Sequence, residues 1–261
     1  MPSLTPTAIV TGAASGIGRA IALALAKSGY AIALVGRTAA TLEQAATEIH
    51  KLGATALAIP ADVSNSDQVD RMIRHAHEKL GRIDVLVNAA GVAPMIPTPD
   101  ITPAQWHEII DTNLSSVFYT TRAVWPILRN QHIQFVADHR TRSGDAPIPR
   151  NVTTGGCIIN ISSMAARDPF PGLGAYAVAK SGVNMLTQVT AREGEPFGIR
   201  TFAIAPAGVE TPMFRELLTP DQVPSDQILR PEDVASLALD FIQGSLRHSS
   251  GETLYLQRHI N

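Results

Sequence analysis

Short apolar runs alternate along this chain with longer amphipathic stretches, and this alternation constrains the fold more than any other feature. The apolar runs are four to seven residues long, which is the length of buried strands. Helical patterns fill the gaps between them, as in repeated βαβ units, so we expect an α/β fold around a mostly parallel sheet. The expected strands are Ala8–Thr11, Ala31–Val35, Ala54–Ile59, Ile83–Val87, Cys157–Ile161, Ile199–Ala205 and Thr253–Leu256.

Composition narrows the class of protein. With 261 residues, 45% of them hydrophobic, the chain can bury one sizeable core, so a single domain over residues 1–261 is expected. A formal net charge of -2 without a charged tail argues against a nucleic-acid partner. The single cysteine, Cys157, excludes an intramolecular disulfide and a cysteine-cluster metal site, and no metal is expected. No secretory signal or membrane-length apolar run is visible, so a cytoplasmic protein without a membrane partner is expected.

One stretch interrupts the alternation. Residues 130–155 show neither a helical nor a strand period and include several arginines and prolines. We expect an inserted surface loop without regular structure, and loops of that length are usually either functional or disordered. Simple surface elaboration and a role in assembly or partner binding both remain open.

A glycine-rich turn follows the first expected strand and leads into the apolar helical run Ala20–Ala26. Free N–H groups and the positive dipole end at a helix start attract phosphate, and glycines let a dinucleotide approach the backbone closely. The Gly-x-x-x-Gly-x-Gly spacing is a variant of the dinucleotide fingerprint. The expected cofactor contacts here are Gly12, Ser15, Gly16, Ile17 and Gly18.

The end of the second expected strand bears on which dinucleotide binds. An acidic residue there would favour NAD, but the chain has Gly36-Arg37, and a guanidinium suits a 2′-phosphate. NADP(H) is therefore the preferred cofactor and NAD(H) stays possible, because Arg37 could also be a solvated surface arginine. Asp62 and Val63 follow the third strand and could meet the adenine or simply begin the next loop.

Tyr176 and Lys180 are four residues apart in a helical run, so phenol and ammonium share one face. A nearby cation lowers the pKa of a phenol, and we expect Lys180 to lower that of Tyr176. Hydride delivery to a carbonyl produces an alkoxide that needs a proton, which a tuned Tyr176 could donate. Ser163, at the end of the fifth strand, could hydrogen-bond the developing oxyanion.

These motifs, in this order and spacing, resemble the short-chain dehydrogenase/reductase family over nearly the whole chain. The resemblance implies a Rossmann-type doubly wound sheet of about seven mostly parallel strands with helices on both faces. It also implies that Asn113 holds a water for proton relay and that Lys180 binds the nicotinamide ribose. The remaining implied cofactor contacts are Asn88, Ala89 and Gly91 on the adenosine side, Tyr176 at the nicotinamide, and Val209 and Thr211 at the carboxamide.

The sequence departs from the family pattern in the segment that follows Pro206. Ala207 replaces the usual glycine, and Leu256-Gln257-Arg258 replaces the common Asp-Gly-Gly turn. Residues 212–230, which hold three prolines, are expected to form a mobile lid over the substrate. Met164, Phe170, Pro171, Met213, Phe214 and Leu217 could wall an apolar pocket or belong to the core.

The expected function is reduction of a ketone by NADP(H), with a 3-oxoacyl thioester as the substrate that the resemblance suggests first. An NAD-dependent alcohol, sugar or steroid dehydrogenase is the alternative enzyme, and a non-catalytic dinucleotide sensor or scaffold is the alternative outside enzymology. Either enzyme would act on a small-molecule carbonyl or alcohol. The resemblance further implies a homotetramer formed through the helices around Thr112–Leu128 and Ala175–Glu193.

Overall fold

The computed structural model describes residues 5–143, 154–245 and 249–258. Within these ranges seven strands form one sheet in the order β3-β2-β1-β4-β5-β6-β7, and every neighbouring pair is parallel. The expected Rossmann-type sheet is confirmed. The strands are β1 Thr7–Thr11, β2 Ala31–Gly36, β3 Ala56–Pro60, β4 Val85–Asn88, β5 Gly156–Ile161, β6 Ile199–Pro206 and β7 Thr253–Leu256.

Burial on both faces explains why the strands could be located from short apolar runs in the sequence. Every residue of β1, β4 and β5 is buried, and strands covered on both faces have continuous apolar runs instead of alternating ones. The expected bounds shift most at β3 and β4, which begin two residues later than expected, at Ala56 and at Val85. The Ala54 N–H instead donates to the Ile49 carbonyl of the preceding helix, 3.3 Å away, and so still belongs to the helix end.

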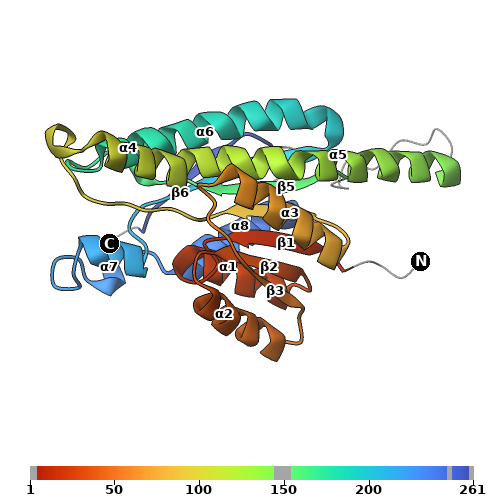
Figure 1. Ribbon diagram of the computed structural model, residues 1–261, viewed down its shortest axis with the longest axis horizontal. Coiled ribbons are helices and arrows are strands. Elements are labelled where there is room, and N and C mark those ends of the chain that lie inside the picture. The colour runs from red at the N-terminus through yellow and green to blue at the C-terminus, as the bar shows by residue number, and fades with distance from the viewer. Residues whose placement is uncertain (1–4, 144–153, 246–248, 259–261) are drawn as a thin grey trace.

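Helices cover both faces of the sheet (Figure 1). One apolar cluster joins the sheet to α1, α2 and α8, and a second joins it to α3 and α5 on the other face, where α4 and α6 also lie. The helices are α1 Gly16–Lys27, α2 Ala39–Lys51, α3 Ser66–Leu80, α4 Pro103–Ile110, α5 Ser116–Ser143, α6 Gly174–Gly194, α7 Pro212–Leu217 and α8 Pro231–Gln243.

The strand order reverses at β1, which pairs with β2 on one side and with β4 on the other. In such sheets ligands bind outside the carboxyl ends of the strands at the reversal point. Thr11 and Asn88 are register partners there, so the glycine-rich turn after β1 and the segment after β4 leave the sheet side by side.

The structure corrects the expectation of an unstructured loop over residues 130–155. Helix α5 continues through this region to Ser143 and extends past the end of the sheet (Figure 1). Side-chain pairs one helical turn apart support it: the Phe135 and His139 rings stack, and Gln134 donates to Asp138 at 2.9 Å. A largely exposed helix needs no apolar stripe, which is why no period was visible. Residues 144–153 of the expected loop lie outside the described residues.

Candidate active site

The glycine-rich turn brings the backbone of the first strand and helix into very close approach. A Cβ at Gly18 would lie 2.4 Å from the Gly12 carbonyl oxygen, and one at Gly12 would lie 2.9 Å from the Ala89 backbone. Ser15 is the N-cap of α1, but its side chain makes no capping hydrogen bond, which leaves the first amides of that helix available. This cradle fits the phosphates of a dinucleotide, because any larger residue at either glycine would fill it.

Thr11 is a site residue that the sequence reasoning named only as part of a motif. Its hydroxyl donates to the Val87 carbonyl at 3.3 Å and accepts from the N–H groups of Ala89 at 3.0 Å and Ala90 at 3.2 Å. These bonds hold the segment after β4 against the glycine-rich turn. A threonine at the end of a strand, just before such a turn, is the sequence signal for this role.

Asn88 uses its side chain within the protein. Its amide donates to Asn160 at 2.9 Å, and its oxygen accepts from Thr120 at 2.7 Å, while Asn160 donates in turn to Thr187. The resulting buried polar chain links β4 and β5 to α5 and α6. An expected contact of Asn88 with the dinucleotide would therefore come from its main chain, as it would for Ala89 and Gly91.

At the expected adenosine end, Arg37 is exposed and makes no ion pair or hydrogen bond with any described residue. Asp62 has a structural role, because its Oδ1 accepts from both the N–H and the hydroxyl of Ser64, at 2.9 and 2.7 Å. Val63 is buried, and Asn65 caps α3. Arg37 is thus free to bind a phosphate, and Asp62 keeps its second oxygen for an adenine.

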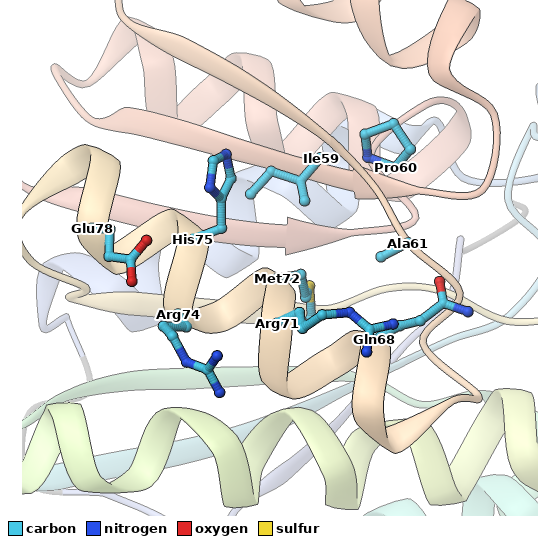
Figure 2. Close-up of a pocket in the computed structure, with 9 residues that line it drawn as sticks. All are labelled: Ile59, Pro60, Ala61, Gln68, Arg71, Met72, Arg74, His75 and Glu78. Carbon is cyan, nitrogen blue, oxygen red and sulfur yellow. The ribbon is translucent and has the colours of Figure 1, made fainter.

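A cavity of about 460 Å³ opens at the outer edge of the sheet, between β3 and α3. Figure 2 shows Arg71 and Gln68 near Ala61, with His75 over Ile59. None of the expected site residues lines this cavity, so it is separate from both the glycine-rich turn and Tyr176.

Ser163, Tyr176 and Lys180 come together at the carboxyl end of β5. Tyr176 shares a hydrogen bond with Ser163. The Lys180 ammonium lies 5.6 Å from the centre of the Tyr176 ring and donates to the Ile161 carbonyl at 2.8 Å. Only 4% of Lys180 is exposed. The neighbouring Ser162 has the structural role that its position suggests, because its hydroxyl donates to the Lys180 carbonyl.

The expected lowering of the Tyr176 pKa by Lys180 is wrong for this structure. Burial raises the pKa of the phenol above its usual value, and the hydrogen bond with Ser163 offsets part of that rise. Burial also lowers the pKa of Lys180 to about 8, because a buried ammonium loses its hydration. Desolvation is the largest cause of both shifts, and in Tyr176 it favours the protonated phenol.

Asn113 lies in a π-helical turn, Asp111–Ser115, that the sequence did not predict. Its side-chain amide donates to the Ile109 carbonyl, the acceptor that its backbone N–H would use in an α-helix, and also to the Val92 carbonyl. A Cβ at Gly91 would lie 2.7 Å from Asn113 Oδ1 and 3.7 Å from Lys180 Nζ. Gly91, Asn113 and Lys180 thus border one small space.

The segment after β6 closes the other side of the glycine-rich turn. Gly16 lies against Thr211, whose Cγ2 would be 3.0 Å from an added Cβ. The Thr211 hydroxyl accepts from the Phe214 N–H and caps α7, and Val209 pairs with Leu229. Ala207, one of the departures from the family pattern, donates its N–H to the Leu256 carbonyl and so ties this loop to β7.

Comparison with protein families decides the class. The short chain dehydrogenase family matches residues 6–134 and 148–222, which include the glycine-rich turn, Asn113, Ser163, Tyr176 and Lys180. This chain is a short-chain dehydrogenase. The gap in the match, residues 135–147, falls in the overhanging end of α5 and the segment after it. The family uses a nicotinamide dinucleotide, and its members are reductases and dehydrogenases that interconvert C=O and CH–OH groups.

Two curated relatives illustrate the range of this similarity. A 3-oxoacyl-[acyl-carrier-protein] reductase of Synechocystis is 33% identical over 240 residues, covering 90% of this chain and 88% of the relative. A 3beta-hydroxysteroid dehydrogenase of Mediterraneibacter gnavus is 32% identical over 206 residues, covering 78% of this chain and 66% of the relative. The catalytic fold is thus shared with enzymes for very different ketones.

Solved structures agree with this dehydrogenase fold. The 3-ketoacyl-(acyl-carrier-protein) reductase of Brucella melitensis, complexed with NADH, has a TM-score of 0.82 at 28% identity, covering 97% of this chain and 96% of that one. A 7 alpha-hydroxysteroid dehydrogenase complexed with NADH and 7-oxo glycochenodeoxycholic acid has a TM-score of 0.84 at 26% identity, covering 97% and 92%.

Within the described residues of the dehydrogenase, no helix is long and apolar enough to cross a bilayer. No group of three or more His, Cys, Asp and Glu side chains within the same ranges is arranged to hold a metal ion.

Proposed function

We propose that this dehydrogenase reduces a ketone with NADPH as the preferred hydride donor, and that a 3-oxoacyl thioester is among its substrates. The observation that carries the proposal is the placement of the Tyr176 phenol beside Ser163 and Lys180 at the carboxyl end of β5. A phenol that keeps its proton at neutral pH is suited to donate it, which is what ketone reduction requires.

The bound nicotinamide would transfer hydride to the carbonyl carbon, and the carbonyl oxygen would then take up a proton. Tyr176 donates that proton from its phenol oxygen, and Ser163 donates a hydrogen bond to the same substrate oxygen. Lys180 has three donors, of which one is bonded to Ile161, so the others are available for the ribose hydroxyls and for the relay through Asn113. The reverse reaction runs through the same groups.

The preference for NADPH rests on Arg37. Arg37 directly follows β2, and its guanidinium has no partner among the described residues. The position holds no carboxylate that could bind a ribose 2′-hydroxyl. The Brucella relative was solved with NADH. An NADH-dependent reaction is therefore the alternative within the same mechanism.

The choice of substrate rests on the curated relatives. Several are 3-oxoacyl-[acyl-carrier-protein] reductases, from Synechocystis at 33% identity and from Staphylococcus at 30–31%. The hydroxysteroid dehydrogenases support a steroid as the second candidate substrate. Both candidates place a ketone within an apolar body.

We further propose a homotetramer. Helices α5 and α6 expose large apolar side chains, at Phe118, Val178, Met185 and Val189, which a second copy of the chain would cover. Sedimentation at four times the monomer mass would support this assembly, and a monomer would refute it. The cytoplasmic location and the lack of a nucleic-acid partner stay predictions from the sequence.

The experiment that tests the function is a panel of ketones, including short 3-oxoacyl thioesters and steroid ketones, followed by NADPH and NADH absorbance. Tyr176→Phe is expected to lower kcat by about a hundred- to ten-thousand-fold while dinucleotide binding persists. Tyr119→Phe removes a hydroxyl from α5, outside the proposed site, and serves as the control. Turnover in Tyr176→Phe equal to that of the control would remove the phenol from the mechanism and favour the sensor alternative.

A further inference from the structure

A cation stands close to the catalytic serine, and none of the roles assigned so far uses it. The chain makes one 3₁₀ turn after Ser163, over Met164–Ala166, and Arg167 follows directly. The Arg167 guanidinium carbon lies 4.3 Å from the centre of the Tyr255 ring, and its Nη2 lies 3.4 Å from the Met164 sulfur. The aromatic ring and the sulfur hold the guanidinium in place without neutralising its charge.

The charge of Arg167 has no carboxylate partner. The five ion pairs within the described residues use other arginines, and the adjacent Asp168 makes none of them. The Tyr255 hydroxyl accepts from Asn184 of α6 at 3.3 Å, so the ring under the guanidinium is itself fixed. Arg167 is exposed, and its donors are open to a ligand.

The loop that carries this cation also exposes apolar side chains. Phe170, three residues after Arg167, is 65% exposed, and Met95 in the loop after β4 is 48% exposed. The two loops touch, because the Ile96 N–H donates to the Gly172 carbonyl at 2.8 Å and a Cβ at Gly172 would lie 2.7 Å from the Met95 side chain. An exposed apolar surface on the same loop as an unpaired guanidinium matches a ligand with an apolar body and an anionic group.

We propose that Arg167 determines specificity by binding a carboxylate or phosphate of an amphipathic ketone, whose apolar body lies along Met95 and Phe170. The proposal rests on the proposed ketone reduction and adds to it the chemical class of the substrate. Tyr255 is a positioning residue, because it acts on the substrate only through the guanidinium stacked on its ring.

The test uses pairs of ketones that differ only in charge. A ten-carbon methyl-ketone carboxylic acid is compared with its methyl ester, and the matching keto-alkyl phosphate with its keto alcohol. Arg167→Gln is expected to raise KM for the anionic member about ten-fold, the loss of one charge-assisted hydrogen bond at a partly exposed site, with kcat little changed. The larger loss, for acid or for phosphate, identifies which anion the residue binds.

A matched control removes the same charge elsewhere. Arg192→Gln, on the exposed last turn of α6, is expected to keep the wild-type ratio of KM values between the charged and the neutral ketone. Tyr255→Phe keeps the ring and is expected to keep that ratio, whereas Tyr255→Leu removes the ring and is expected to lose about half of the discrimination on a logarithmic scale. If Tyr255 had only a structural role, replacing it would change KM for the charged and the neutral ketone by the same factor.

Isothermal titration of the keto acid into enzyme saturated with dinucleotide gives a second readout that needs no turnover. Weaker binding to Arg167→Gln than to Arg192→Gln supports the proposal. Equal affinity of the two variants for the keto acid overturns the proposal, as does a loss of affinity in Arg167→Gln that is the same for the acid and its ester. If the wild type reduces no ketone in any panel, the proposed function fails, and the titration still decides whether Arg167 binds the anion.

Discussion

Lys180 and Tyr176 face each other without a hydrogen bond between them: the ammonium lies 5.6 Å from the ring centre and donates to the Ile161 carbonyl instead. Lys180 is buried and Tyr176 is half-buried, and desolvation favours the neutral form of each group. The phenol therefore retains its proton and can give it to a substrate oxygen, while the reverse reaction first has to remove that proton.

The first prediction concerns the pH dependence of the two reaction directions. Because burial raises the pKa of Tyr176 above 10.0, the phenolate that alcohol oxidation needs is scarce at neutral pH. The kcat/KM for oxidation is expected to rise steadily up to about pH 10, whereas that for ketone reduction is expected not to rise over the same range. Steady-state rates in both directions measure this, and a plateau of the oxidation rate below pH 8 would contradict it.

The second prediction concerns the cost of burying Lys180. Its pKa falls from 10.5 to about 8 on folding, so between these values the unfolded chain binds more protons and stability rises with pH. The penalty is fully present below about pH 8 and amounts to about 3 kcal/mol. In the dinucleotide-free protein, Lys180→Met is expected to be more stable than wild type at pH 7, with the difference shrinking toward pH 10.5.

Urea unfolding of both proteins at several pH values measures this difference, and Lys79→Met, an exposed lysine of α3, is the control. If the difference in unfolding free energy between Lys180→Met and wild type stays constant with pH, the buried ammonium is not the cause of that difference.

The third prediction concerns the choice of dinucleotide. Arg37→Ala removes the guanidinium expected to bind the 2′-phosphate, so KM for NADPH should rise about ten- to a hundred-fold while KM for NADH stays within about two-fold. Arg71→Ala, which removes an arginine from the cavity of Figure 2, is the matched control. An unchanged KM for NADPH in Arg37→Ala would refute the preference.

The fourth prediction concerns the expected lid at residues 212–230. Arg215 holds this segment together, since it pairs with Glu210 and donates to the carbonyls of Leu218 at 3.3 Å and Val223 at 2.8 Å. The hydrogen bond from Arg215 lowers the pKa of Glu210 to about 2, so the pair persists at any assay pH. Arg215→Met is therefore expected to be cleaved faster within this segment during limited proteolysis.

The same assay tests the lid itself, because dinucleotide with substrate should protect the segment in the wild type. Arg230→Met, whose arginine pairs with Asp233 at the start of α8, is the control for the lost charge. Equal cleavage with and without ligands would mean that the segment does not close over the site.

Residue type and spacing were enough to predict the sheet, the glycine-rich turn and the closeness of Tyr176 to Lys180, because each is local or follows from continuous apolar burial. The π-helical turn at Asn113 was not predictable, since it depends on a side chain taking the Ile109 carbonyl. The raised pKa of Tyr176 depends on burial, which spacing does not reveal. The stack of Arg167 on Tyr255 joins residues far apart in the chain.

Helix α5 begins just after the turn that holds Asn113 and runs toward the amino ends of the strands, where Gln131 bonds both the N–H and the carbonyl of Ile83, just before β4. Every residue added beyond that anchor lengthens the helix away from the reacting groups. An addition at this end of α5 would therefore lengthen the helix away from the chemistry, at the point where the family match is interrupted.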